Sequence, residues 1–232
     1  MGAERKKVFF DLDDTILDFH TAEKVSLTAA FSELKIAFDD ALLRRYSEIN
    51  NWCWQQLELG NRSREEVLVS RFEKLFAEKG IDCDARTAQD RYESRLESGH
   101  YFIPGAPELL EALFPLYDLY LVSNGNSATQ ESRLKSAAIG PYFKGIFISE
   151  EIGVNKPEKA FFDACFAAIP AFRKDDAIIV GDSLSSDILG GINAGIRTCW
   201  FNPTQKRGRE DIRPDYTITE LLQLPALLEK IF

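Results

Sequence analysis

The residues of this 232-residue sequence with the clearest chemical potential are aspartates that follow short apolar runs. Asp11 and Asp13 end one such run, and Asp182 ends another, with Asp187 five residues further on. Carboxylate oxygens without histidine or cysteine beside them favour a hard cation. Mg²⁺ is the expected ion, because it keeps several waters and takes one or two carboxylates plus a substrate phosphate. The aspartates therefore predict a magnesium site that can receive a phosphate group.

A lysine, a serine and an asparagine complete this set. Ser123 and Asn124 end a third apolar run, and Lys156 precedes a proline in a later loop. An ammonium and a hydroxyl suit the charge and the acceptor oxygens of a phosphoryl group. One aspartate could then act as a nucleophile, while a second protonates the leaving oxygen and afterwards activates water. Each motif alone is typical of a turn or a helix cap, so the prediction depends on the whole set.

Short apolar runs alternate with helical patterns along the chain, and they predict the elements that position these residues. The runs span 7–13, 119–122, 145–149, 177–180 and 197–201. This alternation is typical of an α/β fold with a doubly wound, Rossmann-like parallel sheet. Ligands of such sheets bind outside the carboxyl ends of the strands, so the polar residues should meet at one edge.

Two further helices are predicted in the second half of the chain. Pro107–Leu116 is predicted to be a helix that carries its proline in the first turn. Leu184, Ile188 and Ile192 recur at helical spacing, so they should share one face of a further helix.

The interval 18–100 has helical periodicity and no convincing strand, with Gly60 and Gly80 as expected helix ends. About 80 residues of helical pattern exceed the dozen or so that a crossover between parallel strands requires. We therefore predict an all-helical domain over 18–100, inserted into an α/β core that is formed by 1–17 and 101–232.

Composition excludes several classes of protein. With 28 Lys+Arg and 37 Asp+Glu, the net charge is −9, which disfavours binding to polymeric nucleic acid. No apolar stretch approaches the roughly 20 residues of a membrane span, and the first apolar run is too short for an export signal. The four cysteines lie far apart and form no Cys-x-x-Cys pair, as expected of a reduced, cytoplasmic protein. The expected partner is a small molecule.

Four motifs, in this order, resemble those of the haloacid dehalogenase-like (HAD) hydrolase superfamily. They are Asp11-Leu12-Asp13-Asp14-Thr15, Ser123-Asn124-Gly125, Lys156-Pro157 and the segment 181–187, and the resemblance covers the whole chain. The helical insert resembles the α-helical cap of that family. The resemblance implies that Asp11 is a nucleophile and metal ligand. It also implies that Asp13 is a general acid/base that binds Mg²⁺ through its backbone carbonyl, and that Asp182 binds Mg²⁺ directly.

The same resemblance implies roles for the remaining motif residues. Ser123 and the backbone N–H of Asn124 would hold the phosphoryl oxygens. Lys156 would neutralise the charge that the nucleophile shares with the phosphoryl group. Asp187 would act through water or by orienting Lys156.

A closer resemblance is to the YjjG-type 5'-nucleotidase branch, carried by the segments 9–15, 148–154, 186–195 and 199–202. Asp13 favours phosphoryl chemistry, because the dehalogenase branch lacks a carboxylate at this place. The branch implies a Mg²⁺-dependent phosphatase that hydrolyses small phosphomonoesters through an aspartyl-phosphate, with pyrimidine nucleoside 5'-monophosphates as substrates. The alternatives are, in order, an acylneuraminate-9-phosphatase-like or other sugar phosphatase, a phosphosugar mutase, and a non-catalytic binding protein on this fold.

Substrate selection is expected in the cap, and its candidates are Phe19, His20, Trp52 and Trp54. The tryptophans could stack on a base or pack the helices of the insert itself. Because they are two residues apart on a predicted helix, they should face different sides. The basic run 206–209 is predicted to be a solvated loop.

Overall fold

The computed structural model describes residues 5–232, and its contacts divide this part of the chain into two compact units. The α/β unit comprises the chain up to Asp18 together with Tyr101–Ser127 and Ala137–Phe232. The helical unit comprises Phe19–His100 and Ala128–Ser136. Within the described residues, no helix combines the length and the apolar character that crossing a bilayer requires.

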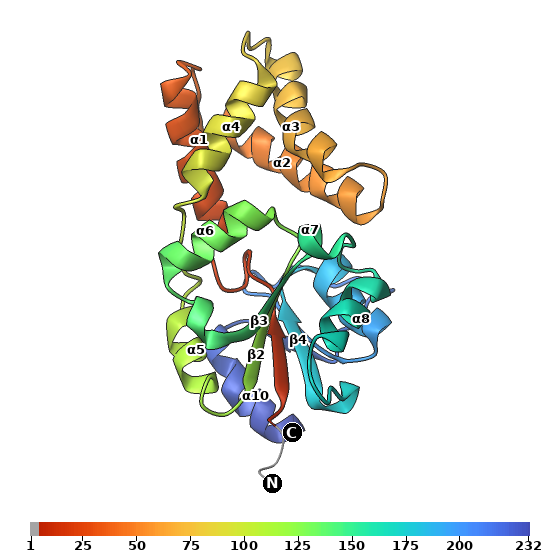
Figure 1. The fold of residues 1–232 in the computed structure, drawn as a ribbon. Coiled ribbons are helices and arrows are strands. Elements are labelled where there is room, and N and C mark those ends of the chain that lie inside the picture. Colours follow the sequence, from red (N-terminus) through yellow and green to blue (C-terminus); the bar gives the residue numbers. More distant parts are fainter. Residues whose placement is uncertain (1–4) are drawn as a thin grey trace. The chain divides into compact units, whose positions relative to one another are not determined.

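The α/β unit is built on one sheet of parallel strands (Figure 1). Its strands are β1 (Lys7–Phe10), β2 (Asp118–Ser123), β3 (Phe143–Ile148), β4 (Ala177–Gly181), β5 (Arg197–Phe201) and β6 (Tyr216–Ile218), in the order β3-β2-β1-β4-β5-β6. Every residue of β1 and β4 is buried, which is why these strands read as continuous apolar runs. The chain builds outward from β1 in one direction and from β4 in the other, so the strand order reverses between these two strands.

Helices cover both faces of the sheet, which makes the α/β unit doubly wound. They are α5 (Ala106–Leu113), α7 (Ser149–Ile152), α8 (Lys159–Ala167), α9 (Leu189–Ala194) and α10 (Leu224–Ile231). Phe161, Phe162 and Cys165 of α8 pack on one face against Phe9 and Ile179. α5 packs with α10 in the remaining layer (Figure 1).

The turn after β4 departs from the predicted helix. Leu184–Ile188 forms one π-helical turn before α9 begins. This wider turn rotates the residues that follow, so Ile192 is 43% exposed whereas Ile188 is buried, and the prediction that they share one face was wrong. Gly191 faces the sheet instead, where an added Cβ would lie 2.5 Å from Cγ2 of Ile179.

The helical unit contains α1 (Phe19–Glu33), α2 (Asp40–Glu58), α3 (Arg64–Lys79), α4 (Ala85–Leu96) and most of α6 (Ser127–Ala137). Local sequence explains the helix ends: Ser63 and Glu66 form a capping box at the start of α3, and Gly80 ends it with a φ of +63°. The aromatic rings of Tyr46, Phe72 and Tyr92 contact one another in the core of this unit.

Helix α6 differs from the predicted domain division, which assigned all of 101–232 to the α/β core. Thr129 Oγ1 donates to Glu93 at 2.8 Å, and Arg133 Nε donates to the carbonyl of Gly99 at 3.0 Å. These bonds join α6 to the end of α4, so Ala128–Ser136 is part of the helical unit.

Candidate active site

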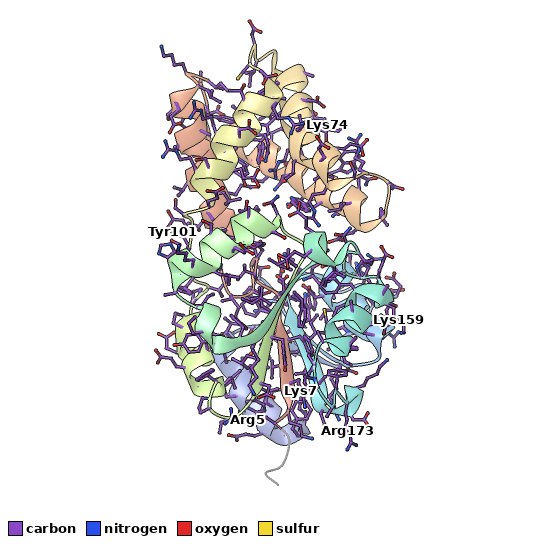
Figure 2. All side chains as sticks on the ribbon, viewed as in Figure 1. Arg5, Lys7, Lys74, Tyr101, Lys159 and Arg173 are labelled. Carbon is purple, nitrogen blue, oxygen red and sulfur yellow. The ribbon has the colours of Figure 1, made fainter. Side chains whose placement is uncertain are left out.

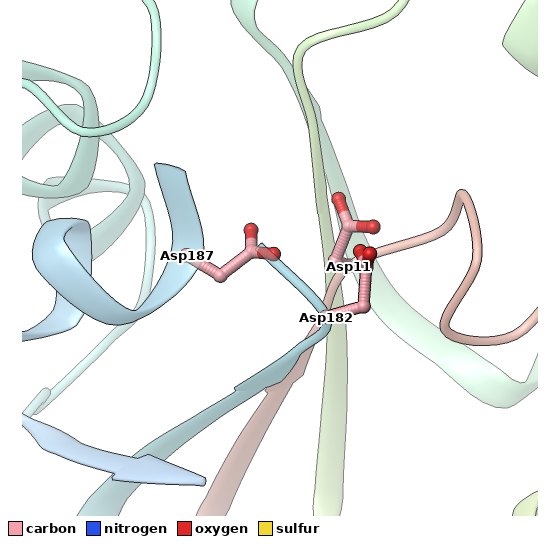
Figure 3. Close-up of side chains that lie close together, drawn as sticks. All are labelled: Asp11, Asp182 and Asp187. Atoms are coloured by element: carbon pink, nitrogen blue, oxygen red, sulfur yellow. The ribbon is translucent and has the colours of Figure 1, made fainter. Parts of the chain in front are cut away.

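The carboxyl ends of β1 and β4 bring three aspartates together. Asp11 follows β1 directly, and its N–H donates to the carbonyl of Val180 at 3.0 Å, which holds it level with the end of β4. Asp182 follows β4, and Asp187 comes from the π-helical turn. Carboxylate oxygens of Asp11, Asp182 and Asp187 lie within 4.8 Å of one another (Figure 3). The cluster lies where the strand order reverses, the position at which open α/β sheets bind ligands.

Lys156 is the cation inside this cluster. Its Nζ donates to Asp11 Oδ1 at 2.6 Å, to Asp187 Oδ1 at 2.7 Å and to the carbonyl of Val122 at 3.0 Å. The residue is 1% exposed, so its ammonium depends on these partners for solvation. Asp187 also accepts from the N–H of Ser183 at 3.1 Å through its other oxygen. Asp187 therefore both belongs to the acidic cluster and orients Lys156.

The side chain of Asn124 positions Lys156 by a contact that the sequence did not reveal. Asn124 Nδ2 donates to the carbonyl of Lys156 at 2.9 Å, and the N–H of Lys156 donates back to Asn124 Oδ1 at 2.9 Å. The resemblance assigned Asn124 a role through its backbone, and a Ser-Asn-Gly turn carries no signal for this side-chain contact. Ser123 is 1% exposed, and its Oγ accepts from the N–H of Gly125 at 3.0 Å.

The cluster has more negative charge than its lysine can neutralise. Burial raises the pKa of Asp11 well above its usual value, Lys156 opposes this rise, and the charges of Asp187 and Asp13 add to it. Burial likewise raises the pKa of Asp182, with further contributions from Asp187 and Asp11. For Lys156, burial disfavours the charged form, but the two carboxylates outweigh burial and raise its pKa.

These residues fit a hard divalent cation. The three converging side chains of Asp11, Asp182 and Asp187 offer only carboxylate oxygens, the ligands that such a cation prefers. Added positive charge would relieve the repulsion among them. Asp13 is half-buried and its carboxylate is not one of the converging three, although its charge reaches Asp11.

Comparison with known proteins identifies the family. The model of the haloacid dehalogenase-like hydrolases matches residues 6–195. The chain belongs to this family of hydrolases. It is 40% identical over 223 residues to the protein named HAD-hydrolase YfnB of Bacillus subtilis, covering 96% of this chain and 95% of that protein.

Two further relatives of this HAD hydrolase have named activities. Pyrimidine 5'-nucleotidase PynA of Streptococcus pneumoniae is 37% identical over 226 residues, covering 97% of this chain and 95% of PynA. Pyrimidine 5'-nucleotidase YjjG of Escherichia coli is 31% identical over 223 residues, covering 96% of this chain and 97% of YjjG. The crystal structure of YfnB bound to magnesium matches with a TM-score of 0.92 over 97% of this chain and 99% of that chain.

The four candidate residues of the HAD hydrolase's helical unit lie in different surroundings. Trp54 packs against the core of this unit, whereas Trp52 is 40% exposed, as their spacing of two residues predicts. The ammonium of Lys74 lies 4.5 Å from the ring centre of Trp52. Phe19 packs on the same core, and His20 is exposed at the start of α1. Whether any of them contacts substrate stays a prediction.

Proposed function

We propose that this HAD hydrolase is a Mg²⁺-dependent phosphomonoesterase that acts on nucleoside 5'-monophosphates through an aspartyl-phosphate. The observation that carries the proposal is the buried carboxylate of Asp11, which Lys156 Nζ contacts at 2.6 Å beside Asp182 and Asp187. A carboxylate fixed between a cation and further carboxylates can accept an anionic group only when additional positive charge is present.

Asp11, Asp182 and the backbone carbonyl of Asp13 would hold the metal. Asp187 would act through water or by orienting Lys156. Bound Mg²⁺ would supply the charge that lets a phosphate dianion approach this acidic cluster. That the related YfnB binds magnesium supports the choice of ion.

The chain's own groups would perform the two steps of hydrolysis. A carboxylate oxygen of Asp11 attacks phosphorus, and the bond from phosphorus to the ester oxygen breaks. Asp13 donates a proton to the leaving oxygen. Asp13 then takes a proton from water, which attacks phosphorus and releases inorganic phosphate and free Asp11.

Lys156 and the loop after β2 would stabilise the transferring group. Lys156 is held in place at its backbone by Asn124 and at its ammonium by Asp11 and Asp187, so its charge is fixed before substrate arrives. The hydroxyl of Ser123 and the N–H of Asn124 would donate to the phosphoryl oxygens.

The nucleotide specificity rests on the two related pyrimidine 5'-nucleotidases. Within the proposal the partner is a small-molecule phosphomonoester and the place of action is the cytoplasm. The acylneuraminate-9-phosphatase-like and mutase alternatives predict different products, so one experiment separates them.

The test is phosphate release from a panel of UMP, dUMP, dTMP, hexose phosphates and acylneuraminate 9-phosphate, with Mg²⁺ and with EDTA. We expect the highest kcat/KM on pyrimidine nucleotides, loss of activity in EDTA, and recovery with excess Mg²⁺. Asp11→Asn should lower kcat by at least about 10³-fold, whereas Asp163→Asn, an exposed aspartate of α8 paired with Lys159, should be as active as wild type. Full activity of Asp11→Asn would refute the mechanism. Hexose phosphate isomerisation without phosphate release would instead identify a mutase.

A further inference from the structure

The loop from 203 to 211, which carries the basic run 206–209, is exposed to solvent as predicted, but its backbone is anchored at both ends. Asn202 is 6% exposed and follows β5 directly. Its Nδ2 donates to the carbonyl of Lys206 at 3.0 Å, and the N–H of Lys206 donates back to its Oδ1 at 2.8 Å. At the far end of the loop, Ile212 is 2% exposed. Both ends of the basic segment are therefore fixed.

Trp200 connects this loop to Asp182. Trp200 packs with Ile188 and Ile212 in one apolar cluster, which joins the loop to the π-helical turn. The indole N–H of Trp200 donates to the carbonyl of Asp182 at 2.8 Å. Because Gly181 lies opposite Trp200 in the sheet, Asn202 and the backbone of Lys206 follow β5 at the same edge at which Asp182 follows β4.

The basic side chains of the loop differ in whether they form ion pairs. Arg209 Nη2 lies 2.6 Å from Asp211 in an exposed ion pair. Within residues 5–232 the structure shows no salt bridge for the side chains of Lys206 and Arg207. The ammonium of Lys206 nevertheless lowers the pKa of Asp182, opposing burial and the surrounding carboxylates, so its charge reaches the acidic cluster.

The acidic cluster needs this charge in order to receive an anion. The carboxylates whose charges meet at Asp11 and Asp182 are those of Asp11, Asp13, Asp14, Asp182 and Asp187. Lys156 and a divalent cation bring three positive charges against four ionised carboxylates, because Asp13 must carry the proton that it donates to the leaving oxygen. The remaining surplus is negative and repels a phosphate dianion, unless a further cation lies at the edge of the site.

We propose that Lys206 is a substrate-binding residue, whose ammonium attracts and holds the phosphate of the incoming phosphomonoester. The proposal rests on the proposed phosphatase function and adds a second lysine to that site. The fixed backbone limits the entropy lost when the side chain engages the phosphate.

Substrate binding and Mg²⁺ binding, measured together, distinguish an electrostatic role of Lys206 from a merely structural one. Removing a cation whose charge acts on Asp182 weakens the binding of an anion, and it strengthens the binding of Mg²⁺ to the same carboxylates. Damage to the fold of the loop would weaken both. The half-saturating concentrations of substrate and of Mg²⁺ should therefore move in opposite directions in Lys206→Ala.

The experiment measures kcat and KM for UMP, the inhibition constant of inorganic phosphate, and the Mg²⁺ dependence, in wild type and variants at low and high NaCl. At low salt, Lys206→Ala should raise KM roughly thirtyfold, the effect of one positive charge on a phosphate dianion at roughly 8 Å and an effective dielectric near 40, with little change in kcat. Lys206→Glu should raise KM further, Lys206→Arg should restore it, and high salt should narrow the differences.

The control is Arg173→Ala, which removes the same charge from the same unit. Arg173 precedes the amino end of β4 and lies near Lys7, which starts β1, away from the carboxyl ends of the strands (Figure 2). Three results would each overturn the proposal. They are an unchanged KM in Lys206→Ala, an equal rise of KM in Arg173→Ala, and weaker binding of both Mg²⁺ and substrate in Lys206→Ala. A wild type inactive on every phosphomonoester would instead refute the proposed function itself.

Discussion

Gly181, the last residue of β4, gives the sharpest test of how the site is held together. A Cβ added at Gly181 would lie 2.6 Å from Cβ of Asp187 and would also overlap the carboxyl group of that residue. The Asp187 side chain cannot simply turn away, since one oxygen contacts Lys156 Nζ at 2.7 Å and the other accepts from Ser183. Gly181→Ala must therefore displace Asp187 from Lys156.

The expected effect has two parts. Bringing a contact of 2.6 Å to ordinary van der Waals distance moves Asp187 by about 1 Å, and such misplacement of a positioning group can lower kcat by about 10²-fold. Overpacking of a buried site lowers the free energy of unfolding by about 1–3 kcal/mol. The loss of activity should thus exceed what the loss of stability explains.

The assay compares Gly181→Ala with Gly190→Ala. A Cβ at Gly190 would lie 2.5 Å from Cε2 of Phe162, so this control overpacks the same unit without touching Asp187. Urea unfolding measures stability, and phosphate release measures kcat at temperatures where both variants are folded. The reasoning is refuted if Gly181→Ala has wild-type kcat, or if both variants lose kcat equally at equal stability.

Two further predictions concern buried polar contacts. Asn124→Ala removes both hydrogen bonds to the backbone of Lys156, so kcat should fall and unfolding free energy should drop by about 1–3 kcal/mol; unchanged kcat would show that Lys156 does not need this support. Glu23 of α1 is buried, and burial raises its pKa above the usual 4.5, opposed by Ser47, Arg71 and Asn50. The folded protein holds the proton of Glu23 more tightly, so the stability of wild type relative to Glu23→Gln should be greatest below pH 4.5 and decline as the pH rises. Urea unfolding across this range measures the difference, and a difference independent of pH would contradict the assignment.

The sequence was sufficient for the strands that position the site. β1, β2, β4 and β5 are largely buried and mostly apolar, and hydrophobic pattern alone locates such runs. It missed β6, because Tyr216–Ile218 is three residues long and shows no continuous apolar run. Edge strands of this length depend on pairing with a neighbour, here β5, which local pattern does not encode.

Contacts between distant segments account for the remaining differences. Helix α6 has polar residues on its contacting side, and its place in the helical unit depends on Thr129 and Arg133 meeting α4 and Gly99. The side chain of Asn124 meets Lys156 across 32 residues of sequence. No helical or strand period reports such pairings, which exist only once the distant segments have come together.

Charge explains why these distant contacts gather at one edge of the sheet. The chain as a whole has a net charge of −9, and the buried cluster around Asp11 brings several of the negative charges close together. Lys156 neutralises part of it and is itself kept protonated by Asp11 and Asp187. The surplus favours the binding of cations, and the proposed metal and Lys206 are what would allow an acidic protein to bind a phosphate dianion. The proposed preference for a small phosphomonoester over a nucleic acid would follow, because the positive charge is confined to the carboxyl edge of the sheet and is not spread along a surface.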